Sequence, residues 1–172
     1  NPSMNEIHTY VDIFQKHILG QKGIVPIRSR QDLNNLRPGK EIGAMLTMEG
    51  ADALQGDLEQ LQVVYDLGVR CLGLTWNYAN WAADGVLEPR QAGLTLKGRA
   101  LIEECNRIGM IIDVSHLNET GFWEVMQLTT KPVIATHSNV YSLCPHPRNL
   151  KHEQLEAIFA KNGIVGMTYV PQ

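Results

Sequence analysis

Short apolar segments recur along the chain and alternate with segments in which apolar residues stand three or four positions apart. The short segments are nearly continuous rather than alternating, as is typical of strands that are covered on both faces in a parallel sheet. They are IGAMLTM (42–48), VRCLGLT (69–75), GMIIDVS (109–115), PVIAT (132–136) and GIVGMTYV (163–170). Each of these segments therefore predicts one parallel strand.

The intervening segments have the spacing of amphipathic helices, and several carry helix-end signals. Thr95 is a predicted N-cap for a helix that Gly109 terminates, and Asn118 is a predicted N-cap for a shorter helix that ends before Pro132. Two further helices are predicted from Leu54 to Tyr65 and around residues 155–159, and an amphipathic helix at residues 3–19 precedes them all. This alternation predicts the α/β class with right-handed crossovers.

Composition narrows the class of protein. The chain has 172 residues, 44% of them hydrophobic, and a formal net charge of -3, which predicts a single domain over residues 1–172. Without a basic cluster we expect no nucleic acid partner, and without an apolar run of about 18 residues we expect no membrane segment. The three cysteines, Cys71, Cys105 and Cys144, lack CxxC spacing, which argues against disulfides and a thiolate zinc site and favours the cytoplasm.

Polar and aromatic residues follow the predicted strands at the ends where parallel α/β folds carry their chemistry. They are Glu49, Trp76, Asn77, His116 and His137. Two imidazoles and one carboxylate on the same rim are a ligand set suited to zinc, with a position left for water or substrate. The long, turn-rich segment 76–93 is predicted to be a functional loop beside this rim.

Two other polar residues near the rim have less direct roles. Asp113 stands three positions before His116, so alternation points it to the opposite strand face. We expect it to bond to a neighbouring loop or to a group that supports a metal ligand, rather than to bind the metal itself. His146 lies between two prolines and is expected to shape its loop.

Three separated motifs resemble the renal or membrane dipeptidase family, which consists of zinc peptidases with a (β/α)8 barrel. The motifs are MEGADALQGDLEQLQVVYDLGVRCLGLTW, GLTLKGRALIEECNRIGMIIDVSH and THSNVYSLCPHPRNL, and they occur in the order of the family. The resemblance implies that Glu49 bridges two zinc ions and that His116 and His137 bind one of them. It also implies that Arg148 binds the C-terminal carboxylate of a dipeptide substrate.

The chain departs from the family pattern at several points. Many members carry a histidine where this sequence has Trp76, so we expect Trp76 and Asn77 to line the substrate pocket instead. No His-x-Asp pair precedes Glu49, and no late catalytic aspartate is found, so at most one zinc ion is expected here. A complete barrel needs about 250 residues.

The resemblance therefore implies a partial (β/α)8 barrel of about five parallel strands, the central portion of a dipeptidase lacking its N-terminal and C-terminal parts. We expect such a chain to self-associate through its uncovered edges and to be inactive or weakly active in isolation. Two alternatives are a catalytically inactive truncated or degenerate paralogue and another metal-dependent amidohydrolase.

Overall fold

A five-stranded parallel sheet forms the centre of the computed structural model, which describes residues 3–169. Its strands, in sheet order, are β3 (Leu46–Glu49), β4 (Val69–Gly73), β5 (Ile111–Asp113), β6 (Val133–Ala135) and β7 (Ile164–Val165). Every neighbouring pair is parallel. The predicted α/β class and its five parallel strands are confirmed, although Val170, at the end of the last predicted strand, lies outside the described residues.

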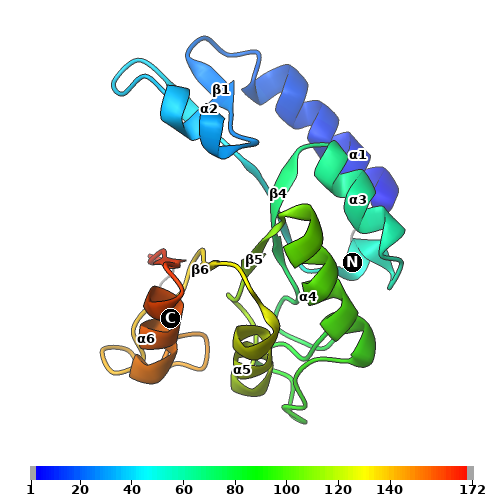
Figure 1. Cartoon of the computed structure of the whole chain (residues 1–172), viewed down its shortest axis with the longest axis vertical. Helices are drawn as coiled ribbons and strands as arrows, with labels where there is room; N and C mark the ends of the chain where they lie inside the picture. Colours follow the sequence, from blue (N-terminus) through cyan, green and yellow to red (C-terminus); the bar gives the residue numbers. More distant parts are fainter. Residues whose placement is uncertain (1–2, 170–172) are drawn as a thin grey trace.

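One helix follows each of the first four strands and packs on the outside of the sheet. These helices are α3 (Glu59–Asp66), α4 (Leu96–Ile108), α5 (Glu119–Leu128) and α6 (His152–Ala160). Figure 1 shows them succeeding one another around an open arc, with the strands on its inner side. Leu72 and Ile112 of the strands are buried in one apolar cluster with Leu101 and Val125 of the helices, so the sheet and its helices share a core.

The predicted ends of α4 and α5 are present. The side chain of Thr95 accepts a hydrogen bond from the N–H of Gly98 at 2.9 Å, and Asn118 accepts one from Gly121 at 2.7 Å. Gly109 ends α4 with φ of 81°, in the left-handed region that only glycine adopts without strain. These local signals fix where each helix starts and stops.

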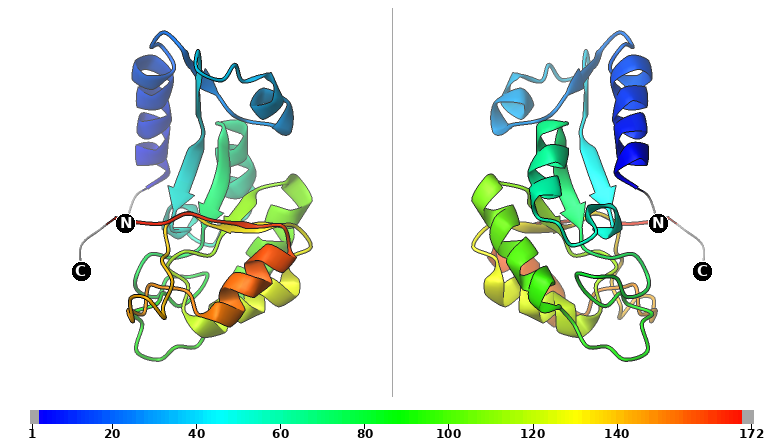
Figure 2. Two further views of the ribbon diagram at one scale, coloured as in Figure 1. Left: turned by 90° about the vertical axis from the view of Figure 1, so that its left-hand side faces the viewer. Right: turned by 90° about the vertical axis from the view of Figure 1, so that its right-hand side faces the viewer.

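The N-terminal third is more elaborate than the sequence predicted. It contains α1 (Met4–Ile13), a π-helical turn η1 (Phe14–Ile18), β1 (Ile24–Pro26), α2 (Arg30–Asn35), β2 (Ile42–Ala44) and, after β3, a 3-10 turn η2 (Asp52–Leu54). The prediction of one strand at residues 42–48 was wrong, because β2 pairs with β1 while β3 pairs with β4. Figure 2 shows β1 and α2 projecting beyond the end of the main sheet.

The strand register aligns the carboxyl ends at one edge of the sheet. Glu49 is paired with Gly73, Gly73 with Asp113, and Asp113 with Ile134. The last residue of β3, Glu49, and the residues that follow β5 and β6 are therefore brought to the same rim. No helix within residues 3–169 has the length and apolar character required to cross a membrane.

Candidate metal centre

Three ligand atoms from three strand ends converge at the rim. Oε1 of Glu49 lies 2.9 Å from Nε2 of His116 and 3.1 Å from Nε2 of His137, and the two Nε2 atoms are 2.9 Å apart. The structure thus brings together the three residues that the strand ends predicted. Among residues 3–169 they are the one group of three metal-binding side chains with converging ligand atoms.

The other ring nitrogen of each imidazole is held by a hydrogen bond. Nδ1 of His116 lies 2.9 Å from Oδ1 of Asn77, an acceptor, so Nδ1 carries the hydrogen and Nε2 keeps the lone pair. Nδ1 of His137 lies 2.6 Å from the hydroxyl of Thr136, which also contacts Asp113. Asp113 is a partner of Thr136 rather than part of the converging group, as predicted.

The donor set fits a single zinc ion. Ligands of a tetrahedral ion at about 2.0–2.1 Å stand about 3.3 Å apart, close to the separations among Glu49, His116 and His137. A carboxylate oxygen and imidazole lone pairs so near one another repel unless a proton or a metal cation lies between them. Glu49 is half exposed and His137 about one-third exposed, so a fourth position is open to the cavity.

Burial keeps His116 neutral at physiological pH. Its pKa is lowered from 6.5 to about 3, mainly because the ring is buried and further because Arg148 and His137 lie near, while Asp113 opposes the shift. A neutral imidazole is the form that binds metals.

The backbone of His116 has a conformation that is uncommon for a residue with a side chain. Its φ is 69°, in the left-handed region, a class of outlier that is concentrated at functional sites. The carbonyl of His116 accepts a hydrogen bond from the N–H of Val86 at 2.8 Å. Because Asn77 binds the ring of the same histidine, the loop at residues 76–93 holds His116 by both backbone and side chain.

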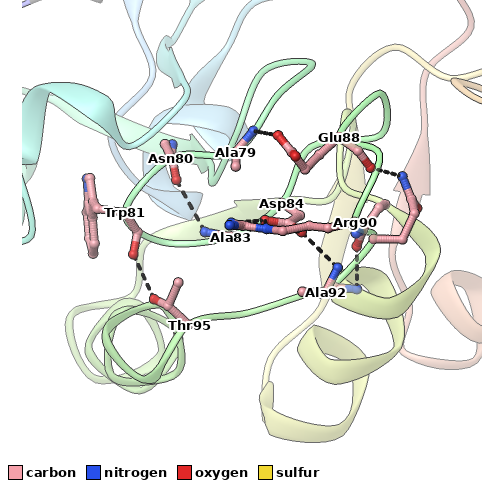
Figure 3. A network of polar contacts seen from close by, with 12 residues as sticks. Ala79, Asn80, Trp81, Ala83, Asp84, Glu88, Arg90, Ala92 and Thr95 are labelled. Carbon is pink, nitrogen blue, oxygen red and sulfur yellow. Dashed lines mark hydrogen bonds and ion pairs between the residues drawn. The ribbon is translucent and has the colours of Figure 1, made fainter.

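Asp84 is the centre of this loop. Its carboxylate is almost fully buried and accepts hydrogen bonds from Nε of Arg90 at 2.9 Å and from the N–H of Ala92 at 2.7 Å, as Figure 3 shows. The pKa of Asp84 is lowered, chiefly by the hydrogen bond from Arg90. At the base of the loop, the hydroxyl of Thr95 donates to the carbonyl of Trp81 at 2.7 Å. The loop is therefore an ordered wall of the site.

A cavity of about 350 Å³ opens beside the three converging residues. Its remaining wall includes Trp76, Asn77, His146 and Arg148. Arg148 is partly buried, which lowers its pKa, and its Nη2 donates to the carbonyl of His137 at 3.2 Å. All predicted substrate-binding residues thus face the same cavity as the candidate metal ligands.

His146 belongs to this wall, although the sequence predicted only a role in shaping its loop. Nδ1 of His146 accepts a hydrogen bond from the N–H of Arg148 at 3.2 Å, which closes the Pro-His-Pro-Arg segment on itself. The available sequence signal was its position two residues before Arg148, with a proline on either side that favours a turn.

Known proteins resemble this chain in sequence and in fold. The model of the family described as membrane dipeptidase (peptidase family M19) matches residues 4–172. The chain is 39% identical to the uncharacterized protein in the PQQ-III 3' region of Acinetobacter calcoaceticus and 36% identical to dipeptidase aclJ of Aspergillus oryzae, over 89% and 87% of this chain. A metallopeptidase of Rhodobacter sphaeroides, solved with a phosphinate mimic of the dipeptide L-Ala-D-Ala, superimposes with a TM-score of 0.82 at 32% identity over 91% of this chain.

The chain spans about half the length of most of these proteins. It covers 51% of the Acinetobacter protein, 36% of the Aspergillus dipeptidase and 46% of the Rhodobacter chain.

Proposed function

Because the chain belongs to the membrane dipeptidase family, peptidase family M19, we propose that it carries one zinc site of a dipeptide-hydrolysing centre, with Glu49, His116 and His137 as ligands. The observation that supports this most directly is the convergence of their three ligand atoms within 3.1 Å of one another. Zinc bound by these three residues would supply a coordinated water of lowered pKa and would polarise the peptide carbonyl.

The residues around the cavity have separate tasks in this proposal. Arg148 presents a partly buried guanidinium that pairs with the C-terminal carboxylate of the dipeptide. Trp76, exposed into the cavity, provides an aromatic wall for a substrate side chain, and Asn77 fixes the ring of His116. The dipeptide mimic bound by the Rhodobacter metallopeptidase supports this substrate class, including a D-residue at the C-terminal position.

The isolated chain is proposed to hold at most one ion and to turn over dipeptides poorly. In a two-zinc centre Glu49 would be shared between the ions, but residues 3–169 contain no other group of three converging ligands. Metal activation and substrate positioning act as a unit, so an incomplete set loses orders of magnitude in rate.

Zinc content after exhaustive dialysis tests the ligand assignment. We expect about one zinc ion per chain, and a loss of binding in the His116→Ala, His137→Ala double variant and in Glu49→Gln. The matched control is the double variant His8→Ala, His17→Ala, which removes two exposed histidines near the N-terminus and should keep the zinc. Retention of zinc without His116 and His137 contradicts the assignment.

Hydrolysis assays with added zinc test the chemistry. Dipeptides should be the substrates of any activity, whereas preferential hydrolysis of cyclic amides would favour another amidohydrolase reaction. Robust dipeptide turnover that Glu49→Gln abolishes would show that this chain is catalytically complete alone or as an assembly, contrary to the proposal of weak activity.

The cytoplasm remains our proposed location. All three cysteines are free, and burial raises the pKa of the thiols of Cys71 and Cys105 to about 12, so these two are unreactive packing residues rather than halves of a disulfide. Localisation of a tagged protein in its native host tests this.

A further inference from the structure

The two carboxylate oxygens of Asp113 have different partners. Oδ1 accepts hydrogen bonds from the N–H groups of Ser115 at 2.9 Å and Thr136 at 3.0 Å, which ties the end of β5 to the end of β6. Oδ2 accepts the hydroxyl hydrogen of Thr136. Asp113 is only 7% exposed, so these contacts are formed away from bulk water.

This arrangement fixes the direction of each proton up to the candidate ligand. An ionised carboxylate can only accept, and a hydroxyl has a single hydrogen, so Thr136 donates to Asp113. Its oxygen is then the acceptor for a hydrogen on Nδ1 of His137, 2.6 Å away. The other neighbour of the hydroxyl, Oγ of Ser115, is a weaker partner at 3.5 Å. With its hydrogen on Nδ1, a neutral His137 has its lone pair on Nε2, the atom that faces Glu49.

We propose that Asp113 and Thr136 are positioning residues that select the metal-binding tautomer of His137. The inference rests on the proposed zinc site, and it assigns to the end of β5 a task beyond carrying His116. Groups that orient metal-bound histidines typically change metal affinity by about 10–100-fold when they are removed.

The variant Asp113→Asn separates the selection of the His137 tautomer from the structural link between β5 and β6. The amide oxygen of asparagine can still accept from the N–H groups of Ser115 and Thr136, so the link between the strands is kept. The amide nitrogen, however, donates where Oδ2 accepted, which turns the hydroxyl hydrogen of Thr136 towards His137. His137 must then carry its hydrogen on Nε2, and zinc affinity should fall by about 10–100-fold.

Substitutions of Thr136 provide the second line of evidence. Thr136→Val removes the hydroxyl and should also weaken zinc binding, whereas Thr136→Ser keeps the hydroxyl and should restore it. The matched control is Thr129→Val, which removes a buried hydroxyl that bonds to Asn106 and Lys131 at the end of α5. This control should lose stability without a change in zinc affinity.

Two measurements on the whole chain test the inference. Imidazole ¹⁵N NMR of the metal-free protein, at a pH where the ring is neutral, reports the tautomer of His137, and competition with a chromophoric chelator reports zinc affinity. We expect the Nδ1–H tautomer of His137 in the parent chain and the Nε2–H tautomer in Asp113→Asn. Zinc binding should be weaker in Asp113→Asn and in Thr136→Val, and unchanged in Thr136→Ser and Thr129→Val.

An unchanged tautomer in Asp113→Asn, or zinc affinity equal to that of the parent chain, overturns the inference. If the tautomers behave as expected but the parent chain binds no zinc, the selection of the tautomer stands and the proposed zinc site fails. The two failures are therefore distinguishable.

Discussion

His116 is held in place by hydrogen bonds to its backbone and to its ring. A left-handed conformation costs a residue with a side chain about 1–3 kcal/mol, and the surrounding structure must offset it. Here the N–H of Val86 binds the carbonyl and the amide of Asn77 binds the ring. The result is a rigid mount for a ligand atom, obtained at some expense to stability.

The low pKa of His116 predicts how stability depends on pH. The folded chain has a pKa of about 3 for this group against the ordinary 6.5, so between these values the unfolded chain binds a proton that the folded chain does not. The effect of His116 on the free energy of unfolding is therefore constant above pH 6.5. Below pH 6.5 the free energy of unfolding decreases as the pH falls, by up to about 1.4 kcal/mol per pH unit. Urea unfolding of the metal-free chain at a series of pH values measures the slope, which should be shallower in His116→Gln. Equal slopes would contradict the prediction.

The strand ends allowed the converging residues of the site to be predicted from sequence, but not the hydrogen bonds that orient them. Glu49, His116 and His137 were identifiable because each follows an apolar strand and parallel strands share one carboxyl edge. Thr136 was not, because its role depends on the rotation of a hydroxyl between Asp113 and an imidazole, which no spacing encodes.

At the scale of elements, the loop at residues 76–93 depends on Asp84. Asp84→Ala leaves the N–H of Ala92 without its acceptor and releases Arg90, so we expect a loss of about 1–3 kcal/mol in the free energy of unfolding. Glu119→Ala, which removes the exposed partner of Lys151, is the control and should cost less than about 1 kcal/mol. Similar small losses in both variants, measured by urea unfolding, would show that Asp84 does not hold the loop.

The contact between α4 and the same loop requires a glycine. A Cβ added at Gly98 would lie 1.9 Å from the carbonyl oxygen of Ala82, which already accepts a hydrogen bond from Thr95. Replacement of glycine by alanine inside a helix normally stabilises by about 1 kcal/mol, but Gly98→Ala should instead destabilise by about 1–3 kcal/mol. Thermal unfolding beside Ala100→Gly, which should lose stability through helix propensity alone, checks this. A more stable Gly98→Ala protein would refute the close approach.

Elements were predictable where helix caps and apolar runs coincided, as at Thr95, Asn118 and Gly109. The run at residues 42–48 was misread because a continuous apolar segment does not reveal its pairing partner. Its first part pairs with β1, a strand that contains Pro26 and is too short to give a clear pattern, and its second part pairs with β4.

At the scale of the whole molecule, the five-stranded sheet has an unpaired edge at β3 and another at β7 within residues 3–169. Four large apolar side chains near β7 are more than half exposed: Phe159, Ile164, Met167 and Tyr169. An open edge beside exposed apolar surface favours pairing with another chain, so we expect association that increases with concentration.

Sedimentation velocity over a range of concentrations tests this expectation. Lysine at Ile164 and Met167 should reduce association, whereas Leu96→Lys, at a still more exposed apolar residue at the start of α4, should not. A monomer at every concentration would contradict the prediction.

The order of the strands has a consequence for cooperativity. Each strand pairs only with its neighbours along the chain, so an opening that begins at β7 can stop at β6 or β5 without disturbing β3. Glu49 is the last residue of β3 and His137 follows β6, so a cation bound by both would link strands that lie three positions apart in the sheet. Metal binding would then convert a series of separable unfolding steps into a single transition.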